Sequence, residues 1–169
     1  GEYDARQWER LVEKFPQHPR THEVILQYPE AKQSLGQLRT LLSYAPEKEK
    51  RAKGRDRAVK AYSEQLTPQD WEMVADSYWE TWEYQKAAAA YAKAPKTPRN
   101  IYRQARGLQV SGETGTAKDI YQQLSRQFPD AEETGLGLRR LASMVSREEA
   151  LSYLEQVINE FPKEAPHAL

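Results

Sequence analysis

Apolar side chains recur along most of this chain at intervals of three and four residues, and prolines and helix-capping residues interrupt them repeatedly. This spacing places apolar side chains on one face of an α-helix, and a proline ends one helix or starts the next. No stretch alternates polar and β-branched apolar residues, so no sheet is expected. The sequence predicts helices over residues 4–15, 19–28, 30–44, 67–82, 84–94, 97–112, 113–128, 130–144 and 146–161.

The segment EKEKRAKGRDR, residues 47–57, is the most highly charged part of the chain. It is either a phosphate or nucleic-acid contact, or a solvated helix face or loop between repeats. The second interpretation is favoured, because interleaved acids neutralise part of the positive charge and no aromatic residue accompanies it. The helical period resumes over residues 58–66.

One apolar pattern occurs three times in the second half of the chain. The first copy is Trp71, Val74, Ala75, Tyr78, Ala87, Tyr91, Ala94 and Pro98. The second copy is Ala105, Leu108, Ala117, Tyr121, Leu124 and Pro129. The third copy is Leu138, Leu141, Ala150, Leu154, Val157 and Pro162. Equivalent alanines lie 30 residues apart (Ala87 to Ala117) and then 33 residues apart (Ala117 to Ala150), so the chain is built from repeats.

The first copy resembles the tetratricopeptide pattern W-x2-L-G-x2-Y, A-x3-F and P in order and spacing. That pattern describes two antiparallel helices, in which small residues let the backbones approach and aromatic residues fill the space beside them. Such a pair cannot bury both of its faces alone, so each pair needs a neighbour. The predicted fold is all-α, a right-handed superhelix of about ten helices arranged in tetratricopeptide-like pairs.

The repeats divide the chain into predicted regions. Residues 1–66 form divergent helical hairpins, residues 67–98, 99–129 and 130–162 form three repeats, and residues 163–169 begin a truncated helix. The chain opens with half a repeat, because Phe15-Pro16 matches the dipeptides that close the second helices at Phe128-Pro129 and Phe161-Pro162. With no initiator methionine, these features predict an excised piece of a longer protein.

Composition narrows the classes of function. The chain of 169 residues is 38% hydrophobic and 30% charged, which suits a folded helical array. Lys plus Arg equals Asp plus Glu at 25 each, so the net charge does not favour a nucleic-acid partner. The absence of cysteine excludes disulfides and thiolate metal sites. No apolar run approaches the ~20 residues that a membrane helix needs.

No arrangement of residues predicts catalysis, a metal site or a cofactor. His18 and His22 have metal-ligand spacing, but Pro19 starts a helix between them and no third ligand lies nearby. The pairs Glu132-Glu133 and Glu148-Glu149 could suggest a glycosidase. Both pairs occupy first helical turns, where acids complement the helix dipole. The chain is therefore predicted to be non-enzymatic.

The aromatic residues are the strongest candidates for binding. In tetratricopeptide proteins the first helix of each repeat lines the concave surface, and by this resemblance that surface displays Asp76, Trp79, Glu80, Arg99, Tyr102, Arg106 and Arg139. A tryptophan beside carboxylates and arginines can stack on a sugar or hold a peptide side chain. Alternatively, Trp79 and Trp82, which lie outside the repeat pattern, pack against residues 58–66.

The run from Leu66 to Gln109, LTPQDWEMVADSYWETWEYQKAAAAYAKAPKTPRNIYRQARGLQ, with the later YQQLSRQFPDAEETGLGLRRLA, resembles the helical superhelix of bacterial, especially cyanobacterial, soluble lytic transglycosylases. The resemblance implies a non-catalytic region, in the periplasm or cell envelope, that helps to hold a peptidoglycan strand or positions an absent catalytic domain. The family's catalytic E-S and G-L-M-Q motifs do not occur, so no catalytic residue is carried over.

Two alternatives remain open. The chain is either a protein-interaction array that binds an extended peptide or a partner helix in its concave groove, or a spacer whose large aromatic residues all belong to the core.

Overall fold

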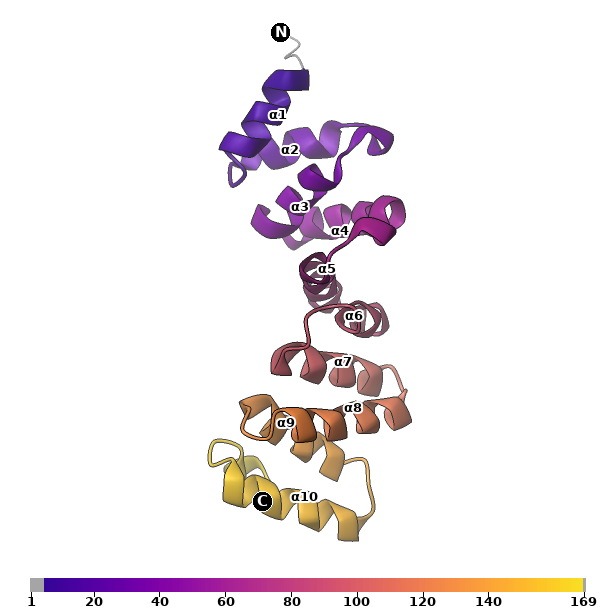
Figure 1. Ribbon diagram of the computed structural model, residues 1–169, viewed down its shortest axis with the longest axis vertical. Helices are drawn as coiled ribbons and strands as arrows, with labels where there is room; N and C mark the ends of the chain where they lie inside the picture. The colour runs from indigo at the N-terminus through magenta and orange to yellow at the C-terminus, as the bar shows by residue number, and fades with distance from the viewer. Residues whose placement is uncertain (1–4, 169) are drawn as a thin grey trace. The chain divides into compact units, whose positions relative to one another are not determined.

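The computed structural model describes residues 5–168, and all of its regular structure is helical (Figure 1). The α-helices are α1 (Ala5–Lys14), α2 (Pro19–Gln27), α3 (Leu35–Tyr44), α4 (Lys48–Tyr62), α5 (Pro68–Glu80), α6 (Tyr84–Tyr91), α7 (Pro98–Val110), α8 (Thr114–Gln127), α9 (Glu132–Ala142) and α10 (Arg147–Glu160). Three short 3-10 helices are η1 (Glu30–Lys32), η2 (Ser63–Gln65) and η3 (Ala165–His167). Residues 5–168 contain no strand, so the predicted all-α class of ten helices is confirmed.

The chain forms two compact units, residues 1–83 and residues 84–169. The division falls between α5 and α6, inside the predicted repeat 67–98. The repeat boundaries stay predictions, and each unit is described by itself below.

In the first unit, α3 and α4 pack along each other, and α5 packs against both. One buried cluster of this unit draws on every helix from α1 to α4, and its members are Val12, Ile25, Leu38, Leu41, Ala45 and Ala58. The predicted helix 4–15 corresponds to α1, although its first residue lies outside the described range. The charged segment 47–57 is helical from Lys48 onward, because Glu47 is the N-cap of the 15-residue helix α4.

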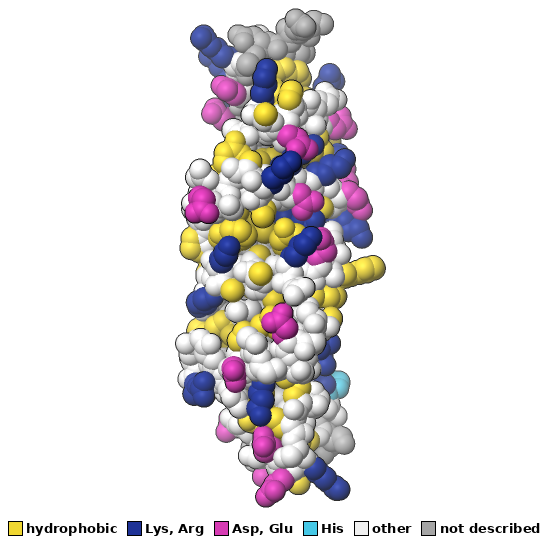
Figure 2. Space-filling model, turned by 90° about the vertical axis from the view of Figure 1, so that its right-hand side faces the viewer, with side chains coloured by type: hydrophobic (Ala, Val, Ile, Leu, Met, Phe, Trp, Pro, Cys, Tyr) yellow, Lys and Arg dark blue, Asp and Glu magenta, His cyan; other side chains and the backbone are white. Residues whose placement is uncertain are grey.

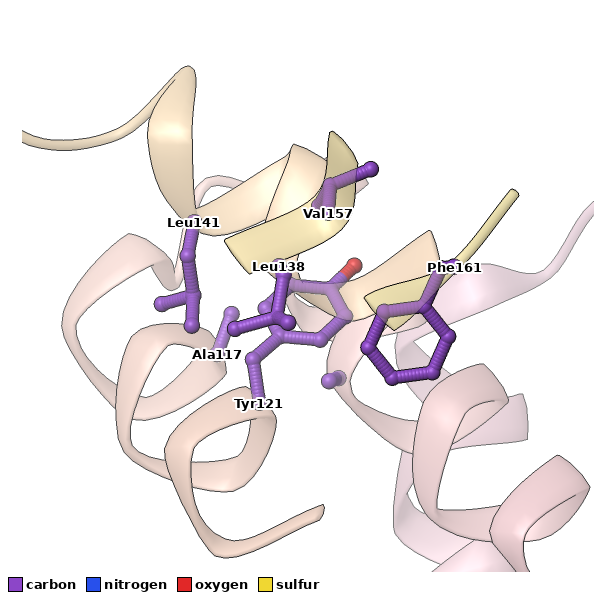
Figure 3. Packing of buried hydrophobic residues seen from close by; sticks show 7 residues of the cluster. Ala117, Tyr121, Leu138, Leu141, Val157 and Phe161 are labelled. Atoms are coloured by element: carbon purple, nitrogen blue, oxygen red, sulfur yellow. The ribbon is translucent and has the colours of Figure 1, made fainter. Parts of the chain in front are cut away.

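In the second unit, each helix from α6 to α10 packs on the next, and α7 also contacts α9. Figure 3 shows side chains from α8, α9 and the end of α10 meeting in one cluster. Its members are Ala105, Ala117, Tyr121, Leu138, Leu141, Val157 and Phe161. Six of these seven residues are repeat-pattern positions, whereas the pattern positions Leu108, Ala150 and Leu154 are only half-buried.

The predicted helix 30–44 is wrong at its start, because α3 begins only at Leu35. A 3-10 turn occupies residues 30–32, and Gln33 is 2% exposed with its amide donating to the Ile25 carbonyl at 2.7 Å. Ser34 and Gln37 then form a reciprocal capping box that starts α3. The hydrogen bond from Gln33 to Ile25 therefore breaks the segment before α3, although the spacing of apolar residues predicts one continuous helix there.

Other helix ends differ from the prediction by a few residues. The helix predicted to reach Trp82 ends at Glu80, and the one predicted to reach Ala94 ends at Tyr91. Ser146 caps α10 by accepting a hydrogen bond from the Glu149 amide at 3.3 Å. Of the truncated helix predicted over residues 163–169, only the 3-10 turn η3 is present among the described residues, and residue 169 lies outside the described range.

Glycine permits close helix contacts in the second unit. A Cβ on Gly135 would lie 2.8 Å from the Phe161 ring, and one on Gly137 would lie 3.1 Å from the Tyr121 ring. Both glycines therefore lie where another helix or its end approaches closely. The tightest approach is at Gly107 of α7, where a Cβ would lie 2.7 Å from the backbone carbonyl oxygen of Tyr84 on α6.

Substituting Gly107→Ala should destabilise the protein by about 1–3 kcal/mol, because a backbone carbonyl cannot move aside without shifting α6. Gly115→Ala is the matched control, since a Cβ there meets nothing within 4 Å. It should leave stability unchanged or raise it by up to ~1 kcal/mol through helix propensity. Urea unfolding followed by circular dichroism measures both, and equal stabilities for the two variants would contradict the close approach.

An ion pair joins α3 to α5. Arg39 donates to the two carboxylate oxygens of Asp70 at 2.9 and 2.6 Å. Asp70 is 4% exposed and also caps α5 reciprocally with Thr67. Burial raises the pKa of Asp70, but the hydrogen bonds from Arg39 and Thr67 outweigh burial, so its pKa lies below the ordinary value.

Replacing Asp70→Asn should reduce the free energy of unfolding at pH 7 by about 1–2 kcal/mol. The loss is kept this small because the Arg39 side chain is 40% exposed, so solvent weakens the ion pair. A depressed folded-state pKa gives stability that is present above the unfolded pKa of ~3.9 and lost as pH falls through the folded value. The difference between variant and parent should therefore shrink below about pH 4. Urea unfolding at pH 7 and pH 3 tests this, with the exposed Asp119→Asn as control.

Candidate functional site

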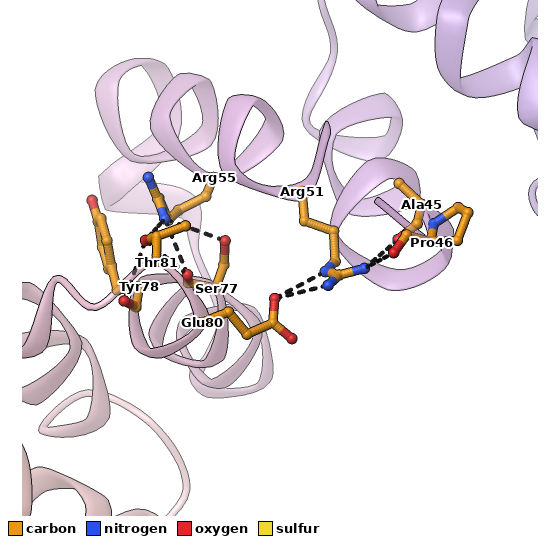
Figure 4. Close-up of polar contacts among 8 residues, drawn as sticks. All are labelled: Ala45, Pro46, Arg51, Arg55, Ser77, Tyr78, Glu80 and Thr81. Atoms are coloured by element: carbon orange, nitrogen blue, oxygen red, sulfur yellow. Dashed lines mark hydrogen bonds and ion pairs between the residues drawn. The ribbon is translucent and has the colours of Figure 1, made fainter. Parts of the chain in front are cut away.

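The predicted concave-face residues are shared between the two units. On α5, Asp76 and Trp79 are half-buried, and Glu80 is exposed. The Glu80 carboxylate accepts hydrogen bonds from Nη2 and Nε of Arg51 on α4 at 2.9 and 3.1 Å (Figure 4). Arg51 also donates to the carbonyl oxygens of Ala45 and Pro46, both at 2.7 Å. Glu80 is therefore held by Arg51, which ties the end of α3 to α5.

Arg55 forms a second polar link between α4 and α5. Its guanidinium donates to the Ser77 carbonyl at 3.1 Å and to Thr81 Oγ1 at 2.8 Å, and it lies 4.2 Å from the Tyr78 ring centroid (Figure 4). Arg55 is only 3% exposed. The interpretation of residues 47–57 as a solvated face is therefore wrong at Arg55. Its position three residues before the buried Ala58 was the available signal.

In the second unit, Tyr102 and Arg106 lie four residues apart on α7 and are both half-buried. The Tyr102 ring is 5.9 Å from that of Tyr121, at an interplanar angle of 51°. Gln109 Oε1 accepts hydrogen bonds from Arg106 and from the Tyr121 hydroxyl, both at 3.0 Å. Burial, with the nearby Tyr102, raises the pKa of Tyr121 well above its usual value, so this hydroxyl stays a neutral donor.

The two other predicted arginines of this unit also have internal partners. Arg99 donates to the side chain of Asn100 at 3.1 Å, and Arg139 on α9 forms an ion pair with Glu164. Helices α7 and α9, the first helices of neighbouring predicted repeats, are in contact. Together they carry the Tyr102 ring and several guanidinium groups. Whether the seven residues bind a ligand stays a prediction.

Helix α7 carries three basic residues over its first nine positions. Its sequence PRNIYRQARGLQV contains Arg99, Arg103 and Arg106 and no acidic residue. On the face shown in Figure 2, by contrast, basic and acidic side chains are interspersed. Helix α7 is therefore a local concentration of positive charge in a chain with no net charge.

Helix α7 ends in a hydrogen-bonding pattern that requires a left-handed residue. Glu113 N–H donates to the Leu108 carbonyl at 2.9 Å and Gly112 N–H donates to the Gln109 carbonyl at 3.1 Å. This is the Schellman arrangement, and Gly112 adopts φ 88° within it. Glycine takes this conformation at no steric cost.

Helix α5 ends in the same pattern, but with tryptophan at the left-handed position. Glu83 N–H donates to the Tyr78 carbonyl at 2.9 Å and Trp82 N–H donates to the Trp79 carbonyl at 3.1 Å. Trp82 has φ 61°, and no other non-glycine residue in the described range has positive φ. Its side chain is 75% exposed, so the interpretation that Trp82 packs against residues 58–66 is wrong. Sequence reasoning missed this site because tryptophan is usually buried.

A groove of about 380 Å³ lies between the start of α9 and the end of α10. Leu136, Phe161 and Pro162 supply its apolar surface. The charged residues around it are Asp130, Glu132, Glu160, Lys163 and Glu164. Lys163 pairs with Glu132, and Arg139 pairs with Glu164, which leaves a modest excess of negative charge.

The two histidines with metal-ligand spacing have separate structural roles. His18 caps α2, with Nδ1 accepting from the Arg20 amide at 3.1 Å. His22 is fully buried, and its Nε2 lies 2.7 Å from the Pro16 carbonyl oxygen, to which it donates. Within residues 5–168, no group of three or more histidine or acidic side chains is arranged to hold a metal ion. None of the helices in this range is long and apolar enough to cross a membrane.

Comparison with known proteins gives the class of fold. Residues 99–131, which include α7 and α8, match the family described as tetratricopeptide repeat. The helix pairs of the described chain thus have a tetratricopeptide-like fold.

Two solved structures share this fold with most of the chain. One, titled "Crystal structure of MamA", is 15% identical in sequence, covers 95% of this chain and 88% of that chain, and has a TM-score of 0.58. The second, "Crystal structure of MamA protein", is 15% identical, covers 97% and 84%, and has a TM-score of 0.57. At this level of identity the likeness concerns the fold alone. No curated protein matches the sequence.

Proposed function

We propose that this chain is a non-enzymatic scaffold that binds a partner protein on the first helices of its repeats. The observation that supports this most directly is the tetratricopeptide match at residues 99–131, together with the contact between α7 and α9. Stacked helix pairs present extended surfaces that suit a peptide or a helix.

The chemistry of α7 specifies the partner further. Its three arginines and the half-buried Tyr102 suit an extended peptide that carries several carboxylates and an apolar or aromatic side chain. Within the protein, Arg106 donates to the neutral acceptor Gln109 Oε1. A partner carboxylate would replace this acceptor with a stronger, charge-assisted hydrogen bond.

The alternative function, in which the chain helps to hold a peptidoglycan strand for a lytic transglycosylase, gains no support from the comparisons. Neither the matched repeat family nor the two similar structures is described as a transglycosylase. Glycan binding and an envelope location therefore stay predictions of the sequence resemblance, and the interaction scaffold is the better supported proposal.

A random peptide library displayed on phage and selected on the intact chain tests the scaffold. The selected peptides should be rich in Asp and Glu, and Arg106→Glu should weaken their binding at least tenfold, about 1.4 kcal/mol. Fluorescence anisotropy with a labelled selected peptide measures the Kd.

Arg126→Glu is the matched control, because this substitution makes the same change of charge at an exposed position of α8. It should alter the Kd less than twofold. Failure to select any peptide, or equal losses for the two variants, would refute binding on α7.

A further inference from the structure

Trp82 combines two unfavourable features in one residue. A bulky side chain at φ 61° strains the backbone, and an indole ring that is 75% exposed leaves a large apolar surface in water. A helix end of this kind requires neither the strain nor the exposed ring. Gly112 completes the same hydrogen-bonding pattern at the end of α7 without a side chain. Strain of this kind at an exposed residue is typical of functional positions.

A cation lies over the exposed ring. Lys48 Nζ is 5.9 Å from the Trp82 ring centroid. Within the part of the chain that the structure describes, Lys48 has no carboxylate partner, whereas Glu80 is already held by Arg51 and Glu47 by Lys50. The α4–α5 edge therefore presents an indole ring beside an ammonium group that lacks a counter-ion.

The charges around Lys48 discriminate between partners. Glu47 and Glu49 flank it in sequence and both are exposed. A nucleic acid brings one phosphate per nucleotide and would be repelled by these carboxylates. A single carboxylate beside an apolar side chain matches one ammonium group and one ring.

We propose that Trp82 and Lys48 form a second binding site, which anchors a partner-protein segment that has one carboxylate next to an apolar side chain. The apolar side chain packs on the indole ring, and the carboxylate pairs with the Lys48 ammonium. Tryptophan is among the residues that contribute most to binding at protein interfaces. This site differs from the α7 surface in location and in needing one carboxylate instead of several.

The decisive variant is Trp82→Gly, because it should make the protein more stable and abolish binding at the same time. Gly removes the backbone strain, so Tm should rise by about 2–4 °C. Peptides selected on the intact parent chain should include a class with a single Asp or Glu beside an apolar residue, and this class should lose affinity at least tenfold for Trp82→Gly. A fall in Tm, or an unchanged Kd, would overturn the proposal, since either would make Trp82 a structural residue only.

Two further variants separate the contributions. Lys48→Gln should weaken the same peptides about threefold to tenfold and remove most of the salt dependence of binding. Arg106→Glu should leave them unaffected, so loss of the α7 surface and loss of the Trp82 site are distinguishable. Competition by a single-stranded oligonucleotide such as oligo(dT) would refute the proposed partner and indicate a nucleic acid instead.

Discussion

The packing of each helix against the next one is the constraint on which the second unit depends. An isolated helix pair leaves one apolar face in water, and here Tyr121, Leu138 and Val157 bury theirs between α8, α9 and α10. Such packing needs neighbouring helices to approach closely. Gly107 lets α7 approach the backbone of α6, and Gly135 lets α9 approach the Phe161 ring. Small residues at these contacts are thus as important as the large ones that fill the core.

The first unit adds polar links to its apolar core. Arg39 joins α3 to the buried Asp70 of α5, while Arg51 and Arg55 join α4 to the C-terminal half of α5. These guanidinium groups reach carbonyl and hydroxyl acceptors as well as carboxylates, so they satisfy backbone groups at the helix ends. Two of the charged residues of α4, Arg51 and Arg55, therefore attach that helix to α5.

The fold and the site differ in how far the sequence determines them. Ala87, Ala117 and the aromatic residues near them were identified as interior by spacing alone, because burial in a repeat follows the helical period. The burial of Arg55 follows the same period, since Arg55 lies three residues before the buried Ala58. The start of α3 and the exposure of Trp82 could not be found this way. The first depends on the hydrogen bond from Gln33 to the Ile25 carbonyl, and the second depends on backbone geometry that only glycine normally signals.

The double role of the Asp70 carboxylate has a consequence for how the first unit opens. Both oxygens accept from Arg39, and Oδ2 also accepts from the Thr67 amide, so this one carboxylate docks α5 onto α3 and starts its first turn. Fraying at Thr67 and separation of the two helices are thereby coupled into a single event. Amide protons in the first turn of α5 should accordingly exchange with solvent in concert with those facing them on α3, as one cooperative unit.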